Sequence, residues 1–335
     1  METTPTVVSL FAGCGGSSLG YEMAGYRELL AIDFDKHACE IFRLNFKCPC
    51  WERDITKVTG KEILDKIKMK PGELDVLDGS PPCQGFSTSG KRRVNDPRND
   101  LFRHFLRIAS EVRPKAIVME NVSGLVKGKM RGIFKEMLRE FDRVGYRVRV
   151  KMLNSMHYGV PQSRQRLFFV AVRKDIDIDN GEITDIWPAH TGKKIGCEAA
   201  LTGCPQDGEI KKPTGKLTKL AAQTKPGERA DRYHDKGHYF NVRKTHPKRP
   251  SNTVTSMFQT GAAGLLHWEG NRFLTIAEVK RLCSFPDEFK MAGSFEQKWA
   301  RLGNAVMPLQ MRAVALAVKE NILAKLKNTS KVNQI

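Results

Sequence analysis

The sequence lacks long apolar runs, paired cysteine spacings and a basic leader, and each absence excludes a class of protein. No stretch approaches the roughly 18 apolar residues of a membrane helix, and the start, METTPTVVSLFAG, has no signal-peptide pattern. The eight cysteines are scattered, and Cys48-Pro-Cys50 has neither Cys-x-x-Cys spacing nor a second pair. We therefore expect no membrane span, no metal site, no disulfide framework and a cytoplasmic location with reduced thiols.

Acidic residues are too few to balance the basic ones. The chain has 56 Lys plus Arg against 37 Asp plus Glu, a formal charge of +19. Residues 206–250 alone hold 12 basic and 5 acidic side chains, and residues 91–107 hold 6 against 2. A positive field of this size concentrates polyanions, so nucleic acid is the expected partner, with merely solubilising charge as the alternative.

Short apolar runs alternate with amphipathic stretches in the first half of the chain. The runs lie at 6–11, 29–33, 74–80 and 115–121, and the helical patterns at 36–46, 99–112 and 132–145. This order predicts an α/β fold with a mostly parallel, doubly wound sheet, which strands at 147–154 and 166–172 complete. Two later helices are expected, at 274–285 and 309–326.

Composition also predicts the domain boundaries. After about Lys174 the chain is rich in Gly, Pro, Lys and Thr, which indicates a smaller, irregular domain. We expect a first domain over 1–173, a smaller second domain over 174–300, and a final helix over 301–335 that returns to the first domain.

A glycine-rich turn follows the first expected strand, in SLFAGCGGSSLG. Glycines at this point let the backbone approach a nucleotide-like ligand closely, although a purely structural turn is the alternative. Asp33 ends the second strand, where an acid typically binds ribose, and Phe34 offers a face for adenine. Asp35 can instead cap the following helix, and Asp54 is a similar case after the presumed third strand.

The stretch DGSPPCQGFS places Cys83 on a stiff, non-helical segment, because two prolines fix two φ angles. Taken alone, this thiol can be a buried filler or a nucleophile. Glu120 ends a neighbouring strand, so its carboxyl should converge with Cys83, unless it caps the next helix. In QSRQR, Arg164 and Arg166 are two apart on one expected strand and should face the same side, with exposed edge arginines as the alternative.

Six ordered motifs together resemble the cytosine carbon-5 DNA methyltransferases. They are FAGCGG at 11–16, GSPPCQGFS at 79–87, ENV at 120–122, QSRQR at 162–166, RFLTIAEVKRLCSFPD at 272–287 and GNAVMP at 303–308. The likeness covers nearly the whole chain. It implies that the domain over 1–173 is the catalytic and cofactor-binding domain and that the domain over 174–300 is the target-recognition domain. Met307 departs from the family, in which a second proline is common.

The resemblance implies a mechanism. Cys83 matches the cysteine whose thiolate adds to carbon 6 of a cytosine flipped out of the duplex, after which carbon 5 takes a methyl group from S-adenosylmethionine. Glu120 matches the acid that holds ring nitrogen 3 and the exocyclic amine. Arg164 matches the arginine near the base's carbonyl oxygen, with Arg166 and Gln162 in support.

The resemblance also implies binding residues. The expected cofactor contacts are Phe11, Ala12, Gly13, Gly15, Gly16, Asp33, Phe34, Asp54, Ile55, Gly79, Pro81, Asn304, Ala305 and Val306. The expected DNA contacts are Gln84, Ser87, Lys91, Arg92, Arg93, Arg249 and Thr253. The segment 85–99 corresponds to the loop that closes over the flipped base, and 174–270 to the variable target-recognition region, where Thr253 can equally belong to a plain strand.

Two alternatives remain open at this level. One is an RNA methyltransferase of the same family, although its usual Cys-Phe-Thr element is absent from 174–270. The other is a catalytically silent DNA-binding homologue, although the Cys, Glu and Arg positions are intact. The short length is typical of a prokaryotic or phage modification enzyme, for which we expect double-stranded DNA as substrate, a nucleoid-associated monomer and possible pairing with a restriction endonuclease.

Overall fold

The structure is a computed structural model that describes residues 4–82, 100–176, 186–206 and 208–326. It divides into two compact units. The first comprises Met1–Leu153, Gln165–Ala189 and Met311–Ile335, and the second comprises Asn154–Arg164 and His190–Gln310. These units are defined by compactness, whereas the domains predicted with boundaries at residues 173 and 300 are functional, and that division stays a prediction.

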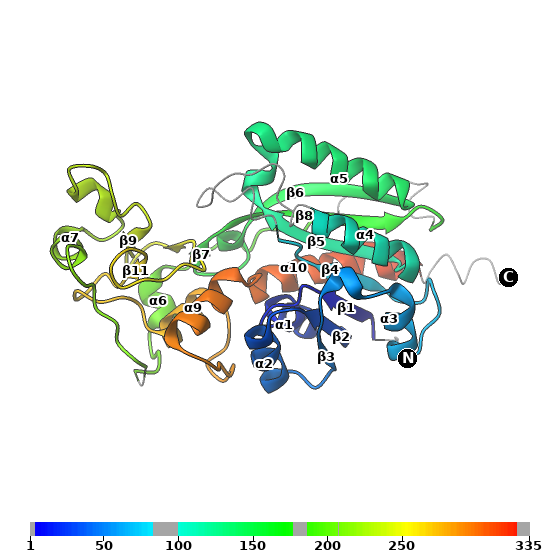
Figure 1. The fold of residues 1–335 in the computed structure, drawn as a ribbon, viewed down its shortest axis with the longest axis horizontal. Coiled ribbons are helices and arrows are strands. Elements are labelled where there is room, and N and C mark those ends of the chain that lie inside the picture. Colours follow the sequence, from blue (N-terminus) through cyan, green and yellow to red (C-terminus); the bar gives the residue numbers. More distant parts are fainter. Residues whose placement is uncertain (1–3, 83–99, 177–185, 207, 327–335) are drawn as a thin grey trace. The chain divides into compact units, whose positions relative to one another are not determined.

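A seven-stranded sheet forms the centre of the first unit (Figure 1). Its order is β3-β2-β1-β4-β5-β8-β6. The strands are β1 (Thr6–Leu10), β2 (Arg27–Asp33), β3 (Cys50–Glu52), β4 (Val76–Gly79), β5 (Ala116–Val122), β6 (Tyr146–Asn154) and β8 (Gln165–Arg173). The first five pair in parallel, and β8 runs antiparallel to β5. The predicted mostly parallel sheet is therefore confirmed.

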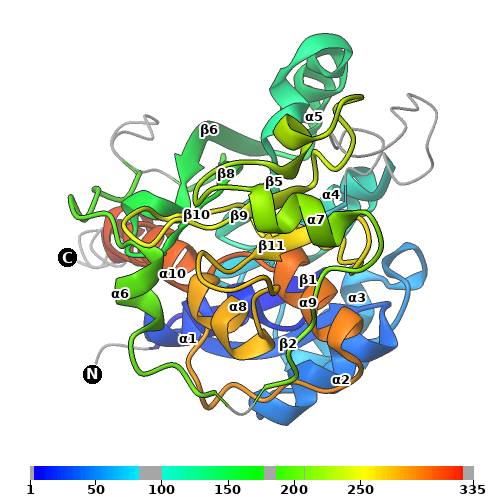
Figure 2. The ribbon, with the colours of Figure 1, turned by 90° about the vertical axis from the view of Figure 1, so that its left-hand side faces the viewer.

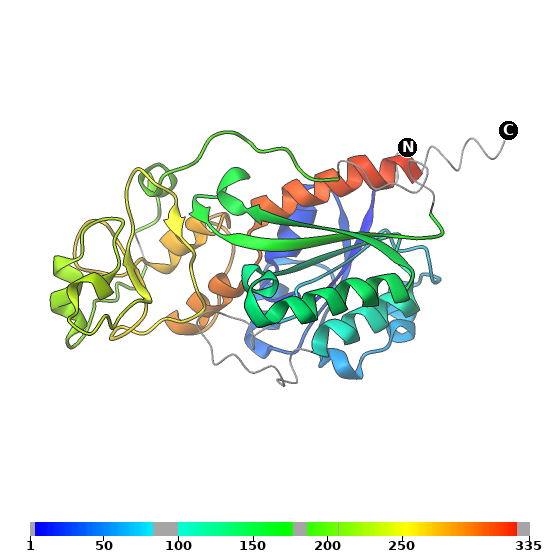
Figure 3. The ribbon, with the colours of Figure 1, turned by 90° about the horizontal axis from the view of Figure 1, so that it is seen from above.

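Helices cover both faces of this sheet, as the alternating sequence pattern predicts. They are α1 (Gly16–Met23), α2 (Lys36–Asn45), α3 (Gly60–Ile67), α4 (Leu101–Val112), α5 (Arg131–Arg143) and α10 (Pro308–Val318). Figure 3 shows α10, in red, on one side of the sheet and α4 and α5 on the other. Apolar side chains such as Leu10, Leu77 and Phe105 form the core between the sheet and α4.

Two of these helices begin at clear caps. Asp35 accepts a hydrogen bond from the Ala38 amide (2.9 Å), so the helix-cap interpretation of this acid is confirmed. Helix α3, which we did not predict, begins with a reciprocal capping box in which Thr59 and Glu62 each satisfy the other's backbone amide.

The second unit has short strands and helices (Figure 2). Strand β7 (Gln162–Ser163) pairs in parallel with β10 (Ser251–Asn252), and β9 (Val242–Lys244) pairs in parallel with β11 (Gly264–Leu266). The helices are α6 (Cys197–Leu201), α7 (Leu217–Gln223), α8 (Ile276–Leu282) and α9 (Phe295–Asn304). An aromatic cluster of Phe258, Phe273, Phe295 and Trp299 packs at its centre. The helix expected within 274–285 is confirmed as α8.

One predicted strand is interrupted. We expected QSRQR to lie on a single strand, but β7 ends at Ser163 and β8 begins at Gln165. The two strands pair with different partners, β10 and β5, which belong to different units. The prediction that Arg164 and Arg166 share one strand face is therefore wrong.

Candidate active site

The glycine-rich loop lies at the carboxyl end of β1 and adopts left-handed backbone conformations. Phe11, Gly13 and Gly15 have φ angles of 57°, 57° and 94°. A Cβ atom on Gly15 would overlap the Phe46 ring, so a larger residue there requires that ring to move. Gly16 begins helix α1 directly after this turn. The loop thus places a side-chain-poor stretch of backbone at the sheet edge where α/β proteins bind ligands.

Asp33 links the end of β2 to this loop. One carboxylate oxygen accepts a hydrogen bond from the Gly13 amide (2.8 Å), and the other accepts one from the Asp35 amide (2.9 Å). Its neighbour Phe34 is 71% exposed, although large aromatic side chains are usually buried. An acid at the loop and an exposed ring beside it fit the ribose and adenine of an adenosine ligand. Their predicted ligand contacts stay predictions.

Asp54 and Ile55 follow β3 at the same edge. Asp54 accepts a hydrogen bond from the Thr56 amide (2.9 Å), and this bond holds the pKa of the carboxyl below its usual value. Ile55 is buried in the core of the first unit. The structure therefore gives Asp54 a capping role, beside which a cofactor contact stays a prediction.

Gly79 and Pro81 lie where β4 leads into the Cys83 segment. A Cβ atom on Gly79 would come within 2.6 Å of the Phe105 ring, so glycine lets β4 pack closely against α4. The Pro81 carbonyl accepts a hydrogen bond from the Asn121 side chain (3.3 Å), which ties this segment to the end of β5. Asn121 adjoins Glu120, so the approach to Cys83 is fixed beside the predicted acid.

Cys83 itself lies outside the described residues. The same holds for the predicted DNA contacts Gln84, Ser87, Lys91, Arg92 and Arg93, and for the whole predicted closing loop, 85–99. The last described residue before the cysteine is Pro82.

Glu120 forms an ion pair with Arg166, whose Nε atom lies 2.8 Å from the carboxylate. Both side chains are largely buried. Burial lowers the pKa of Arg166, and the negative charge of Glu120 opposes that effect. In the antiparallel register Val122 faces Arg166, so Glu120 is its diagonal neighbour. The structure thus assigns Glu120 an ionic partner instead of the helix-cap role that the sequence left open.

Gln162 and Arg164 lie in the second unit, where both bind the segment after β10. The Arg164 guanidinium donates to the Val254 carbonyl (3.0 Å), and the Gln162 side chain accepts from the Val254 amide (3.1 Å). Thr253 donates its hydroxyl proton to the Ser163 carbonyl (2.8 Å). The motifs QSRQR and RPSNTVTS are therefore joined, which the sequence alone did not indicate.

The GNAVMP motif packs against the same segment. Gly303 lies so close to the Thr255 carbonyl that a side chain would not fit, and the Trp299 indole donates to that carbonyl (3.0 Å). The predicted cofactor contact Asn304 ends α9 and is exposed, whereas Ala305 and Val306 are buried. The predicted DNA contact Arg249 is exposed.

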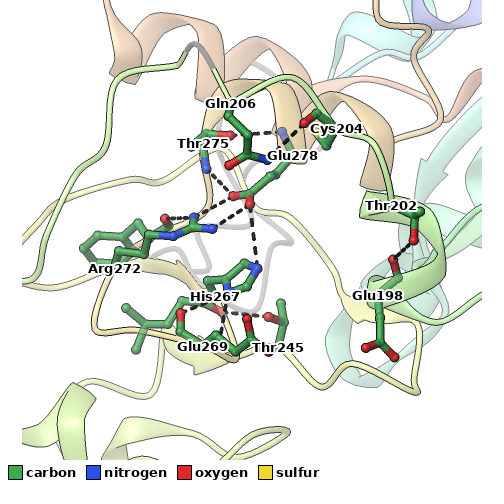
Figure 4. A network of polar contacts seen from close by, with 12 residues as sticks. Glu198, Thr202, Cys204, Gln206, Thr245, His267, Glu269, Arg272, Thr275 and Glu278 are labelled. Carbon is green, nitrogen blue, oxygen red and sulfur yellow. Dashed lines mark hydrogen bonds and ion pairs between the residues drawn. The ribbon is translucent and has the colours of Figure 1, made fainter.

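A buried polar network holds the RFLTIAEVKRLCSFPD motif (Figure 4). Glu278 accepts two hydrogen bonds from the Arg272 guanidinium (2.7 and 2.8 Å) and one from the Thr275 amide (2.7 Å). The His267 ring lies 3.7 Å from the same carboxylate. Burial would raise the pKa of Glu278, but Arg272 and Thr275 hold it below its usual value. This network anchors the motif to its own unit.

The described residues contain no group of three or more His, Cys, Asp or Glu side chains that could hold a metal ion. In that same part of the chain, no helix is long and apolar enough to span a membrane.

The chain is similar to named DNA methyltransferases over most of its length. Type II methyltransferase M1.HphI of Haemophilus parahaemolyticus is 36% identical, over 93% of this chain and 86% of its own length. Type II methyltransferase M.DdeI of Desulfomicrobium norvegicum is 32% identical, over 92% and 87%.

Solved structures share the fold. A DNA modification methyltransferase encoded within an E. coli prophage superposes with a TM-score of 0.77, at 22% identity, over 96% of this chain and 100% of that one. Spodoptera frugiperda DNMT2, in a mutant form, superposes with a TM-score of 0.68, at 21% identity, over 94% and 99%. The model of the family described as C-5 cytosine-specific DNA methylase matches residues 5–320, and the chain belongs to that family.

Proposed function

We propose that this DNA cytosine-5 methyltransferase uses Cys83 as its nucleophile and Glu120 as the acid that holds the target base. The observation that carries the proposal is the buried Glu120–Arg166 pair at the carboxyl edge of the sheet. The Asn121–Pro81 hydrogen bond fixes the chain that leads to Cys83 beside that pair. A buried carboxylate with a fixed partner matches the acid that the reaction requires, and Cys83, two residues after Pro81, is the proposed thiol.

The chemistry follows from the properties of cytosine, whose carbon 5 is a poor nucleophile. The Cys83 thiolate adds to carbon 6, and this raises the electron density at carbon 5. Glu120 donates a hydrogen bond or proton at ring nitrogen 3, which lets the ring accept the sulfur's electrons. S-adenosylmethionine supplies the methyl group. Loss of the carbon 5 proton then expels the thiol and restores the ring.

The residues of the first unit fit this methyl donor. The glycine loop allows a ligand to approach the backbone closely, Asp33 offers an acid at the β2 end, and Phe34 offers an exposed ring. The other proposed cofactor contacts are Asp54, Ile55, Gly79, Pro81, Asn304, Ala305 and Val306. Because the target atom is inaccessible within a stacked duplex, the cytosine must be flipped out before it reaches the thiol.

Double-stranded DNA is the proposed binding partner of the basic side chains. Gln84, Ser87, Lys91, Arg92, Arg93, Arg249 and Thr253 are the proposed contacts, of which the arginines and lysine neutralise phosphates without reading sequence. We further propose a monomer that acts on cytoplasmic DNA. Relatives named type II methyltransferases support pairing with a restriction endonuclease of the same site specificity.

The test is methyl transfer to unmodified genomic DNA, with a transfer-RNA sample in parallel and bisulfite sequencing of both. Protected cytosines in one short DNA context are expected. The Cys83→Ala variant should lose this protection while it still binds DNA and the methyl donor. Protection only in RNA, or in neither sample with folded protein, would contradict the proposal, and a Cys83→Ala variant that still methylates would remove Cys83 from the mechanism.

A further inference from the structure

Three acidic residues point to the same face of the central sheet. Asp78 in β4 pairs with Ser9 in β1 and with Val118 in β5. Glu120 is two residues beyond Val118, so it shares the face of Asp78, because side chains alternate along a strand. Glu28 in β2 pairs with Val7, two residues before Ser9, and lies on this face too. Glu120 has Arg166 as its partner, but the other two acids have no ion pair among the described residues.

Asp78 lies next to the start of the glycine-rich loop, because it pairs with Ser9 of β1, two residues before Phe11. It is 2% exposed and accepts a hydrogen bond from the Tyr21 hydroxyl of α1 (3.3 Å), the helix that follows the loop. The Ser17 hydroxyl in the first turn of α1 also faces it. The next residue along the chain is Gly79, a proposed cofactor contact, so Asp78 connects the loop with the segment that leads to Cys83.

Glu28 also lies between the sheet and α1. Its carboxylate oxygens are buried near the Ser9 and Ser18 hydroxyls but form no hydrogen bond of good geometry with them. The titratable groups that face Asp78 are therefore Tyr21 from α1, Glu28 from β2 and Glu120 from β5.

Burial changes the titration of both acids. It raises the pKa of Asp78 to about 7, with a smaller contribution from the charge of Glu120, and it raises the pKa of Glu28 to about 8. The carboxyl of Asp78 therefore gains its negative charge within the physiological range. A nearby cation would favour that charge, and no described Lys or Arg side chain forms an ion pair with it.

We propose that the Asp78 carboxylate makes the cofactor site selective for charge, favouring the cationic methyl donor over its neutral product. The inference rests on the proposed function. Methyl transfer converts the positively charged sulfonium of S-adenosylmethionine into the uncharged thioether of S-adenosylhomocysteine. A buried carboxylate without a cationic partner attracts the first much more than the second, because the Coulomb energy is large in a medium of low dielectric constant. Asp78 thereby favours exchange of spent product for fresh donor.

The experiment measures binding of both ligands to the full chain by calorimetry, at about pH 6 and about pH 8.5, on either side of the titration. A third ligand is the unreactive analogue that carries an ammonium group in place of the sulfonium. The positive sulfonium lowers the pKa of the donor's own amino group, so each affinity is corrected for the separately measured titration of the free ligand. The wild-type preference for the two cationic ligands should rise by about tenfold with pH.

Three variants assign the effect. Asp78→Asn should remove most of this pH dependence, whereas Tyr21→Phe, which takes away the hydrogen bond and keeps the charge, should retain it. Glu28→Gln should also retain it, which separates the two acids. If Asp78→Asn instead weakens all three ligands equally, Asp78 is only structural and the inference fails.

The wild-type measurement keeps the inference testable even if Asp78→Asn does not fold. A preference that is constant across this pH range would overturn it. A wild-type protein that binds none of the three ligands would overturn the proposed cofactor itself, a result distinct from binding without charge selectivity.

Discussion

The Nε atom of Arg166 lies 2.8 Å from the carboxylate of Glu120, and the two side chains are diagonal neighbours on antiparallel strands of the central sheet. Both are largely buried, so each neutralises a charge that would otherwise be costly to hold away from water. Glu120 is thereby kept in one position at the end of β5.

Removal of Arg166 should therefore affect stability as well as catalysis. Arg166→Met leaves the Glu120 charge buried without its partner and should lower the free energy of unfolding by about 3–5 kcal/mol. The double variant Arg166→Met with Glu120→Gln removes both charges and should recover much of that loss, while methylation stays abolished. Urea denaturation of the single and double variants measures the coupling, and additive losses would contradict a direct pair.

Gly15 should tolerate substitution less than Gly13, although both have positive φ angles. A Cβ atom on Gly15 meets the Phe46 ring, whereas nothing lies within 4 Å of one on Gly13. Gly13→Ala should cost about 1 kcal/mol of unfolding free energy through backbone strain alone. Gly15→Ala should cost clearly more, because Phe46 must also move. Equal losses in chemical denaturation would show that the ring moves aside freely.

The buried acids Asp78 and Glu28 predict how stability depends on pH. Their pKa values are raised by burial, from 3.8 to about 7 and from 4.5 to about 8. Between the ordinary and the raised pKa of each acid, the folded chain binds more protons than the unfolded chain. The free energy of unfolding therefore falls as pH rises, and each carboxyl contributes up to about 1.4 kcal/mol per pH unit. Denaturant unfolding without cofactor, over about pH 4–9, should show this decline.

The matched variants for this prediction are Asp78→Asn and Glu28→Gln. Each replaces a titrating carboxyl by a neutral amide of the same shape and should flatten its own part of the decline. A wild-type profile that rises steadily from acid to neutral pH, and is unchanged by either variant, would contradict the raised pKa values.

The Arg272–Glu278 pair should stabilise the second unit. Arg272→Met leaves Glu278 buried without its two strong hydrogen bonds, so the second unit should lose about 3 kcal/mol or more. Arg272→Lys keeps the charge but cannot form the two-pronged contact, and should lose less. Limited proteolysis reports on local unfolding of this unit, and equal protection of both variants and the wild type would contradict the prediction.

Local sequence patterns were sufficient for most of the first unit. Alternating apolar runs and amphipathic stretches predicted β1, β2, β4, β5, α2, α4 and α5, because a buried parallel strand and a half-buried helix differ in period. Helix α3 was missed although Thr59 and Glu62 form a capping box, since the eight residues of GKEILDKI carry only a short periodic pattern.

Long-range pairing accounts for what the sequence could not predict. The break between β7 and β8 depends on the pairing of Gln162 with Ser251, far away in the chain, and no local pattern encodes it. The Glu120–Arg166 contact depends on the antiparallel register of β5 and β8. The sequence places Asp78 within an apolar strand, and only the position of Tyr21 against it reveals a buried carboxyl with a partner. The roles of the individual site residues remain predictions.

Substitution of Phe34 should change cofactor affinity with little effect on the free energy of unfolding. Because its ring is 71% exposed, Phe34→Ala removes little packing and should change the free energy of unfolding by less than about 0.5 kcal/mol. If the ring stacks on adenine, the affinity for S-adenosylmethionine should fall about fivefold, since a stacked aromatic pair contributes about 1 kcal/mol. Met23→Ala is the matched control, because Met23 is also exposed (38%) but lies at the end of α1, away from the loop. Calorimetric binding that is equally strong in both variants would remove Phe34 from the cofactor site, whereas a loss confined to Phe34→Ala would place adenine against its ring.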